Sequence, residues 1–173
     1  MAQRTRKKNT KKQYKTKDLV VYPSHGVGKI IGIEEEEIAG DNLQLYVVSF
    51  EKEKMILRVP LHKADDAGMR RLRTKDEMDP VVTTLKGRAK IKRTMWSRRA
   101  QDYQEKLNSG NPVMIAEVLR DLHRADDQPE QSYSERQLYE LALDRLAREY
   151  AAVEKIDQDA AEQKIESFLL RAA

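Results

Sequence analysis

The sequence predicts an α+β protein, in which a small, strongly bent β domain precedes a compact helical domain of about five helices. Between residues 18 and 60 the chain consists of short β-branched runs separated by turn residues. After residue 79, apolar residues recur at helical spacing instead. With 173 residues the chain is long enough for two small domains and too short for a long solenoid.

The first 17 residues are expected to form a disordered basic tail. They contain no acidic residue and no periodic apolar pattern, so the segment cannot offset the entropy that it would lose on ordering. Its basic residues are Arg4, Arg6, Lys7, Lys8, Lys11, Lys12, Lys15 and Lys17. We expect only nonspecific attraction to phosphates from this tail.

The β domain is expected to span residues 18–73. Its predicted strands are residues 19–22, 27–33, 43–50 and 54–59, with hairpin turns at residues 23–26 and 39–42. Four or five short strands in about 45 residues are too few for a β-sandwich. They favour a small Tudor-like or KOW-like barrel.

Residues 74–78 are the predicted linker and residues 79–173 the predicted helical domain. Asp79 and Pro80 open its first helix, where the aspartate can cap free amides and the proline fits the first turn. Ser134, with Gln137 three residues later, predicts a capping box at the start of another helix. The other helices are expected at residues 97–107, from residue 112, and at about residues 159–170.

Catalysis is not expected from this sequence. The chain has no cysteine, and its three histidines lie in different modules at no metal-ligand spacing. No residue stands in a recognisable nucleophile context. We therefore expect a protein that is not an enzyme and that has neither a metal site nor a cofactor.

Two segments invite other interpretations. Residues 26–29, Gly-Val-Gly-Lys, suggest a phosphate-binding loop, but the spacing is wrong and Ile30 stands where a hydroxyl is needed. A tight hairpin is the simpler explanation. The acidic run at residues 34–37 suggests a metal site, but successive strand residues point to opposite faces and cannot converge on one ion.

The positive charge is concentrated although the net charge is only +4. Residues 86–99 contain no acidic residue, and their cations are Lys86, Arg88, Lys90, Lys92, Arg93, Arg98 and Arg99. Acidic residues outnumber basic ones in the chain after residue 99. An anionic partner such as nucleic acid is expected at this basic segment.

Trp96, the only tryptophan, lies within this basic segment. A lone tryptophan commonly anchors a core, but the cations on both sides would be costly to bury. An indole among arginines can instead lie at a DNA surface, where the cations neutralise phosphates and the ring wedges against an unstacked base step. We favour an exposed, DNA-facing Trp96.

Arg58 interrupts the apolar strand at residues 55–60. This pattern indicates an edge strand, which either carries a solvated charge that blocks unwanted pairing or is offered to a partner. The residues themselves leave both alternatives open.

Four segments together resemble the CarD/CdnL family of bacterial RNA polymerase-binding transcription factors, in order and in spacing. They are residues 20–28 (VVYPSHGVG), 57–60 (LRVP), 96–99 (WSRR) and 116–122 (AEVLRDL). The resemblance covers essentially the whole chain after the tail. It implies a Tudor-like domain that binds the polymerase β subunit through its edge strand, and a helical domain that contacts DNA at the upstream edge of the transcription bubble.

The resemblance also implies roles for individual residues. Arg58, Pro60 and Val48 would line the polymerase contact. Trp96 would be the minor-groove wedge, and its DNA-binding neighbours would be Arg98, Arg99, Arg93, Lys92, Lys90 and, as a phosphate contact, Arg136. One departure is Glu36, which stands where some relatives have a polymerase-binding arginine.

The expected function is therefore that of a monomeric transcription-initiation regulator that stabilises promoter open complexes without sequence-specific DNA recognition. We expect it in the cytoplasm, because the chain has no cysteine and no stretch that is apolar and long enough to span a membrane. Through RNA polymerase it would be associated with the nucleoid. The alternatives are an RNA- or ribosome-associated module, and a polymerase-bound elongation or repair partner.

Overall fold

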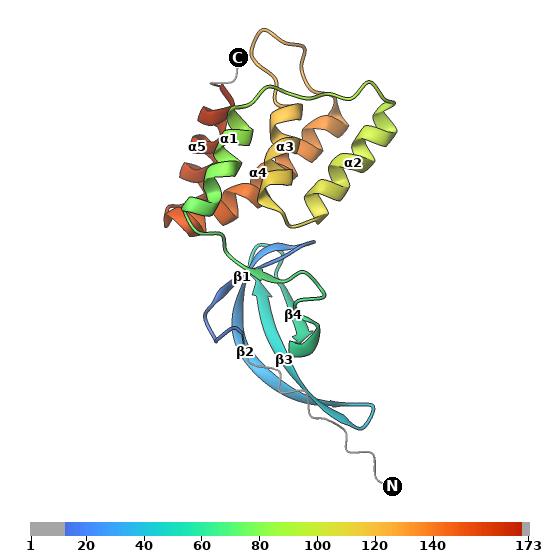
Figure 1. The fold of residues 1–173 in the computed structure, drawn as a ribbon, viewed down its shortest axis with the longest axis vertical. Coiled ribbons are helices and arrows are strands. Elements are labelled where there is room, and N and C mark those ends of the chain that lie inside the picture. The colour runs from blue at the N-terminus through green and yellow to red at the C-terminus, as the bar shows by residue number, and fades with distance from the viewer. Residues whose placement is uncertain (1–12, 171–173) are drawn as a thin grey trace.

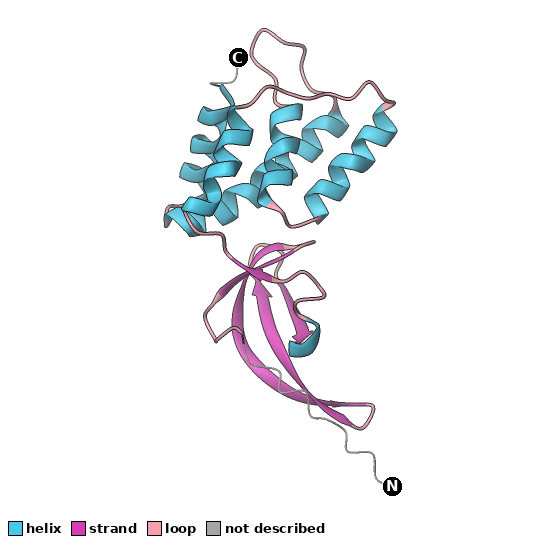
Figure 2. Cartoon of the chain, in the orientation of Figure 1, coloured by secondary structure: helices cyan, strands magenta, loops and turns pink. Residues whose placement is uncertain are grey.

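The computed structural model describes residues 13–170 of the protein. A curved sheet occupies one end of the molecule and a bundle of helices the other (Figure 1, Figure 2). The β elements precede all the long helices in the chain. The predicted α+β fold class is confirmed.

The β domain is a five-stranded antiparallel sheet with the strand order β4-β3-β2-β1-β5. Its strands are β1 (Leu19–Tyr22), β2 (Gly26–Ile38), β3 (Asp41–Phe50), β4 (Met55–Pro60) and β5 (Arg70–Arg71). Strand β2 is longer than predicted, because residues 34–37 remain paired with β3 as far as the hairpin turn. Among the described residues β4 and β5 are the two edges, so the sheet curves around its core without closing.

The core of the β domain lies on one face of β3. Tyr46, Val48 and Phe50 are buried there, together with Ile30 of β2. Alternation along β3 predicts that these three residues share a face. The structure shows that this face is the interior one.

Residues 26–29 are the start of strand β2, paired with β1 through the Tyr22–Gly26 register. A Cβ atom at Gly28 would lie 2.7 Å from Cγ1 of Val48 and 2.7 Å from Cε1 of Phe50. This glycine is therefore required for packing between strands. The hairpin interpretation is confirmed.

Residues 13–17, which the sequence assigns to the tail, lie against the β domain. The backbone N–H of Gln13 donates to Oη of Tyr46 at 3.0 Å, and the Tyr14 ring packs edge-on against Tyr46. The backbone N–H of Lys17 donates to the carbonyl of Ile30 at 2.7 Å. The remainder of the predicted tail, residues 1–12, lies outside the described residues.

The helical domain has the five expected helices around one buried apolar cluster. They are α1 (Asp79–Lys86), α2 (Trp96–Asn108), α3 (Pro112–Leu122), α4 (Tyr133–Glu154) and α5 (Gln158–Leu170). Helix α3 is central and contacts α1, α2 and α4. A short 3₁₀ turn at Leu61–Lys63 lies between β4 and β5, and another at Asp76–Met78 lies between β5 and α1.

Two predicted helix starts are wrong in detail. Asp79 is the first residue of α1 and makes no capping hydrogen bond, because the preceding 3₁₀ turn already continues into the helix. The cap of α4 is Ser132, whose Oγ accepts from the backbone N–H of Glu135 at 3.3 Å. The motif at Ser134 and Gln137 therefore lies inside the helix.

The predicted linker is docked on the helical domain. Met78, at the end of the second 3₁₀ turn, is buried in the helical core. Oγ1 of Thr74 accepts from the backbone N–H of Glu77 at 3.2 Å and thereby closes this turn.

Within residues 13–170, no helix combines the length and the apolar character needed to cross a bilayer. In the same range, no three histidine, aspartate or glutamate side chains are grouped so that they could hold a metal ion.

Candidate functional site

Strand β4 pairs with β3 on one side only and is an edge of the described sheet. The edge-strand prediction is confirmed. Ile56 and Arg58 alternate with the core-facing residues of β4, and both side chains are about half exposed, at 53% and 51%. Pro60 ends the strand opposite Leu45 of β3. This edge thus presents an apolar residue and a cation side by side.

Arg58 is paired with a carboxylate on a strand that it does not neighbour. Its Nε lies 3.0 Å from Oε2 of Glu34 on β2, across the intervening strand β3. Opposite Arg58 and Glu34, in register, lie Val47 and Leu45 of β3, which are only 4% and 3% exposed. The ion pair therefore helps to cover the outer face of the sheet.

Val48 does not lie on this outer face. Its side chain is fully buried in the β-domain core, and its backbone lies between β2 and β4. Its side chain is therefore not exposed at the surface of this structure, and its place in the polymerase contact stays a prediction. Ile56, which the sequence analysis did not single out, occupies the exposed position beside Arg58. Its apolar type in an edge strand was the available signal.

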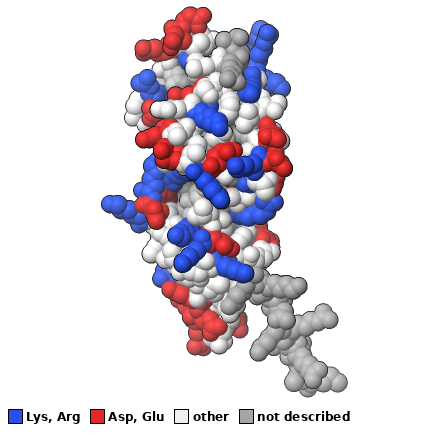
Figure 3. All heavy atoms as spheres, turned by 90° about the vertical axis from the view of Figure 1, so that its left-hand side faces the viewer, with Lys and Arg blue, Asp and Glu red and all other residues white. Residues whose placement is uncertain are grey.

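Glu36 lies in the part of the β2–β3 hairpin beyond the end of β4. It is opposite Leu43, two residues past the Leu45–Pro60 pair. With its acidic neighbours it is exposed, and Figure 3 shows acidic atoms gathered at this end of the molecule. The edge surface is thus flanked by negative charge.

Trp96 is the first residue of α2 and is partly buried. Its ring packs against the helical core, with its centroid 6.3 Å from that of Tyr103 and 5.4 Å from the guanidinium carbon of Arg99. The structure thus combines the two alternatives weighed from sequence. One part of the indole is anchored, and the remainder is open to solvent.

Met95, immediately before α2, is the most exposed large apolar residue among those described, at 78%. The sequence analysis did not identify it. The available signal was a methionine adjoining the tryptophan inside a segment rich in cations. Met95 and Trp96 together form an apolar projection at the start of α2.

The cations around this projection divide into two groups. Lys90, Lys92, Arg93 and Arg98 are exposed, as expected for phosphate contacts. Arg99 is partly buried, and its guanidinium lies near the rings of both Trp96 and Tyr103, so it also supports the indole. The backbone N–H of Lys90 donates to Oδ1 of Asp121 at 2.9 Å and anchors the loop on α3.

Arg136 is exposed in the first turns of α4. The starts of α2 and α4 both lie at the end of the helical domain that is remote from the sheet (Figure 1). Arg136 also lines a cavity of about 400 Å³ with Arg124 and His123. Burial lowers the pKa of His123 below the ordinary value of 6.5, so this imidazole is mainly neutral at pH 6.5.

The two domains match known protein families separately. Residues 14–73 match the CarD-like/TRCF RID domain, and residues 80–166 match the C-terminal domain of CarD. The putative transcription factor YdeB of Bacillus subtilis (strain 168) is 26% identical over 151 residues, which cover 87% of this chain and 96% of that protein.

Proposed function

Because this chain belongs to the CarD/CdnL family of transcription factors, which interact with RNA polymerase, we propose that it stabilises the promoter open complex. The proposal rests on one arrangement. A free sheet edge with an exposed cation lies in one domain, and an apolar projection with exposed cations before and after it in the chain lies at the remote end of the other. Such a molecule can bridge a protein and a nucleic acid.

The β4 edge binds the β subunit of the polymerase. Its unpaired backbone groups allow a strand of the partner to add to the sheet. Arg58 and Ile56 supply a charge and an apolar contact beside that edge, and Pro60 limits its length. In the bound state Arg58 exchanges Glu34 for an acidic or carbonyl group of the polymerase.

The Met95–Trp96 projection contacts DNA at the upstream edge of the bubble. Apolar side chains that insert at an unstacked step offset part of the lost stacking, by about 1–3 kcal/mol per base. That range corresponds to about one to two decades in the lifetime of the open complex. The partly anchored indole is held in place before it meets DNA, because Arg99 and Tyr103 fix one part of the ring.

Phosphate contacts supply the remaining affinity for DNA and carry no sequence information. Their residues are Lys90, Lys92, Arg93, Arg98 and Arg136, with Arg99 as a support of the indole. Binding to free DNA is weak and falls steeply with salt. A monomer held on polymerase by its β domain instead receives DNA at a high effective concentration.

A polymerase-bound elongation or repair partner is the second candidate. It is favoured by the description of the β-domain family, which names TRCF beside CarD. The match of residues 80–166 to the C-terminal domain of CarD favours initiation instead. An RNA-binding module is supported only by the basic charge of the loop before α2.

The test is the lifetime of an open complex formed by bacterial housekeeping holoenzyme at a promoter and challenged with heparin. Wild type is compared with Trp96→Ala and Arg58→Glu. We expect wild type to lengthen the lifetime and both variants to lose most of this effect. Arg58→Glu loses it together with binding to a β-subunit fragment, whereas Trp96→Ala retains that binding.

An unchanged lifetime with wild type, at concentrations that saturate the β-subunit fragment, would overturn the initiation proposal. A change in elongation rate in the same preparation would then favour the second candidate. Tight binding to one DNA sequence in the absence of polymerase would contradict the nonspecific mode of DNA contact.

A further inference from the structure

An ion pair between a buried carboxylate and a partly buried guanidinium joins the two domains. Arg70 of β5 donates from Nη1 and Nη2 to the two carboxylate oxygens of Glu149 on α4, at 2.7 and 2.8 Å. Glu149 is 4% exposed and is one of two buried charged residues among those described. Its Oε2 also lies 3.4 Å from the backbone nitrogen of Arg73. A bidentate arginine–carboxylate pair fixes both distance and orientation.

The same guanidinium reaches the loop that joins α2 to α3. Nη2 and Nε of Arg70 donate to the carbonyl of Gly110, at 2.7 and 3.3 Å. Gly110 has φ +71°, and a Cβ atom there would lie 3.0 Å from Cα of Pro23 in the β1–β2 turn. The backbones of the two domains therefore come so close at this glycine that any side chain there would press against Pro23.

Other contacts across the junction are also polar. Arg145 of α4 donates across the junction to the carbonyl of Ser24 at 2.9 Å, and within its own domain to the carbonyl of Leu107 at 2.8 Å. Lys52 of the β domain pairs with Asp144 of α4. Burial lowers the pKa of Arg145, in keeping with its place inside the junction.

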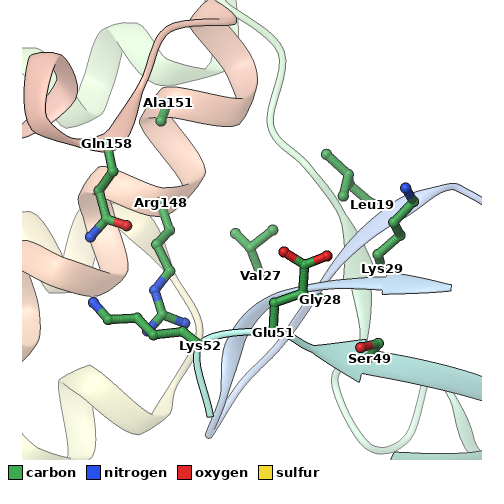
Figure 4. Close-up of a pocket in the computed structure, with 10 residues that line it drawn as sticks. All are labelled: Leu19, Val27, Gly28, Lys29, Ser49, Glu51, Lys52, Arg148, Ala151 and Gln158. Carbon is green, nitrogen blue, oxygen red and sulfur yellow. The ribbon is translucent and has the colours of Figure 1, made fainter. Parts of the chain in front are cut away.

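Beside these contacts the domains are separated by a cleft of about 610 Å³. Figure 4 shows Lys29 and Ser49 on the β-domain side of this cleft and Arg148 and Gln158 on the helical side. An open cleft supplies little packing, so the orientation of the domains depends on the polar contacts.

We propose that Glu149 is a positioning residue that fixes the angle between the domains, so that the molecule acts as a rigid spacer between polymerase and DNA. This inference rests on the proposed function. The path of contacts runs from β5 through Arg70 to Gly110, and from there along α2 to Trp96. Glu149 touches neither proposed partner and acts through this path.

The physical advantage of a rigid spacer is entropic. A projection held at the correct distance and angle loses little freedom when it meets DNA, whereas one on a loose hinge must be ordered at that moment. A buried charge pair suits this task because its geometry is specific. Loss of Glu149 is therefore expected to reduce the effect on open complexes without weakening either separate contact.

Two variants test the junction by different means. Glu149→Gln removes the charge that pairs with Arg70. Gly110→Ala keeps every charge and places a methyl group against Pro23. Glu77→Gln is the matched control for the first variant, because it removes a carboxylate that pairs with Arg71 next to the junction. Gly40→Ala is the control for the second, since Gly40 also has positive φ but no atom within 4 Å.

The relative position of the two domains is measured with spin labels. The chain contains no cysteine, so single cysteines at the exposed positions Asp66 and Glu105 can be labelled specifically. Double electron–electron resonance on the full chain gives the distribution of distances between the two spin labels, one on each domain. Circular dichroism and binding to the β-subunit fragment establish that each variant is folded.

We expect Glu149→Gln and Gly110→Ala to broaden or shift the distance distribution and to lose most of the lifetime extension, while binding to the β-subunit fragment is retained. Both controls should match wild type. A distribution that stays narrow and unshifted in both variants would overturn the proposal, as would a broad distribution with an undiminished lifetime. If wild type itself leaves the lifetime unchanged, the proposed function fails rather than the role of Glu149.

Discussion

Arg58 on β4 and Glu34 on β2 form a 3.0 Å ion pair that crosses the strand between them. Both side chains are about half exposed, so the pair is worth no more than about 1 kcal/mol. It covers Leu45 and Val47, and it engages the guanidinium of Arg58 that is proposed to bind polymerase. In the proposed complex, polymerase therefore competes with Glu34 for Arg58.

Glu34→Gln is expected to strengthen binding to the β-subunit fragment. Removing the internal competitor frees Arg58, and the small value of an exposed pair limits the gain to about fivefold in Kd. Isothermal titration calorimetry measures the difference. Arg58→Glu should abolish binding. Glu37→Gln is the control, because Glu37 belongs to the same acidic run and its carboxylate forms no ion pair within residues 13–170. A weaker complex with Glu34→Gln would show that the ion pair itself is part of the bound surface.

Met95→Ala is expected to shorten the open-complex lifetime without affecting stability. The side chain is 78% exposed, so its removal leaves no cavity in the folded protein. Loss of its contact with an unstacked base should cost about 1 kcal/mol, or about fivefold in lifetime. Met114→Ala, another exposed methionine on α3, is the control. An unchanged lifetime would limit the wedge to Trp96.

Trp96→Ala is expected to lower both the lifetime and the stability, because the indole is anchored as well as exposed. Loss of the packed part of the ring should cost about 1–2 kcal/mol in the free energy of unfolding. Urea unfolding followed by circular dichroism measures this cost, since the only tryptophan fluorescence is lost with the mutation. Full retention of stability would mean that the ring does not pack against Tyr103 in solution.

Gly28→Ala is expected to destabilise the β domain by about 1–3 kcal/mol. Its Cβ would lie 2.7 Å from buried atoms of Val48 and Phe50, which have little room to move. Gly32→Ala, on the same strand with no atom within 4 Å, is the control. Thermal unfolding of both variants compares them. Equal stabilities would contradict the tight packing described for this glycine.

We expect the free energy of unfolding to decrease in acid, as the carboxylate of Glu77 becomes protonated. A hydrogen bond from Arg71 holds the pKa of Glu77 at about 2, below the ordinary value of 4.5. A carboxylate whose pKa is lowered in the folded state stabilises the protein above pH 4.5, and this stabilisation is lost as the pH falls toward 2. Glu77→Gln should therefore show a shallower decline than wild type between pH 4.5 and 2 in urea unfolding. Parallel curves would contradict the paired state.

The starts of the helices show what can be predicted from neighbouring residues alone. Asn111 and Pro112 mark the start of α3, where Oδ1 of Asn111 accepts from the backbone N–H of Val113 at 3.0 Å. For α4 the motif predicted from the sequence was Ser134 with Gln137 alone, although Ser132 with Glu135, two residues earlier, fits the same motif. Only the loop that leads into the helix decides between them.

Local sequence patterns are sufficient to predict the two domains, the edge strand and the basic segment around Trp96. Each depends on periodicity, turn chemistry or charge within a few neighbouring residues. The alternation along β3 also predicted which residues share a face. It did not decide which face is interior. The place of Val48 in the polymerase contact came from the family resemblance, and the structure shows that its side chain lies in the core.

Contacts between residues that are distant in the chain became known only from the folded structure. Met95 is exposed and Trp96 is anchored because of how α2 lies against the helical core. The pairing of Arg70 with Glu149 joins residues 79 positions apart in the chain. No local pattern predicts such a contact, because its free energy arises from burial and geometry that exist only after both domains have folded.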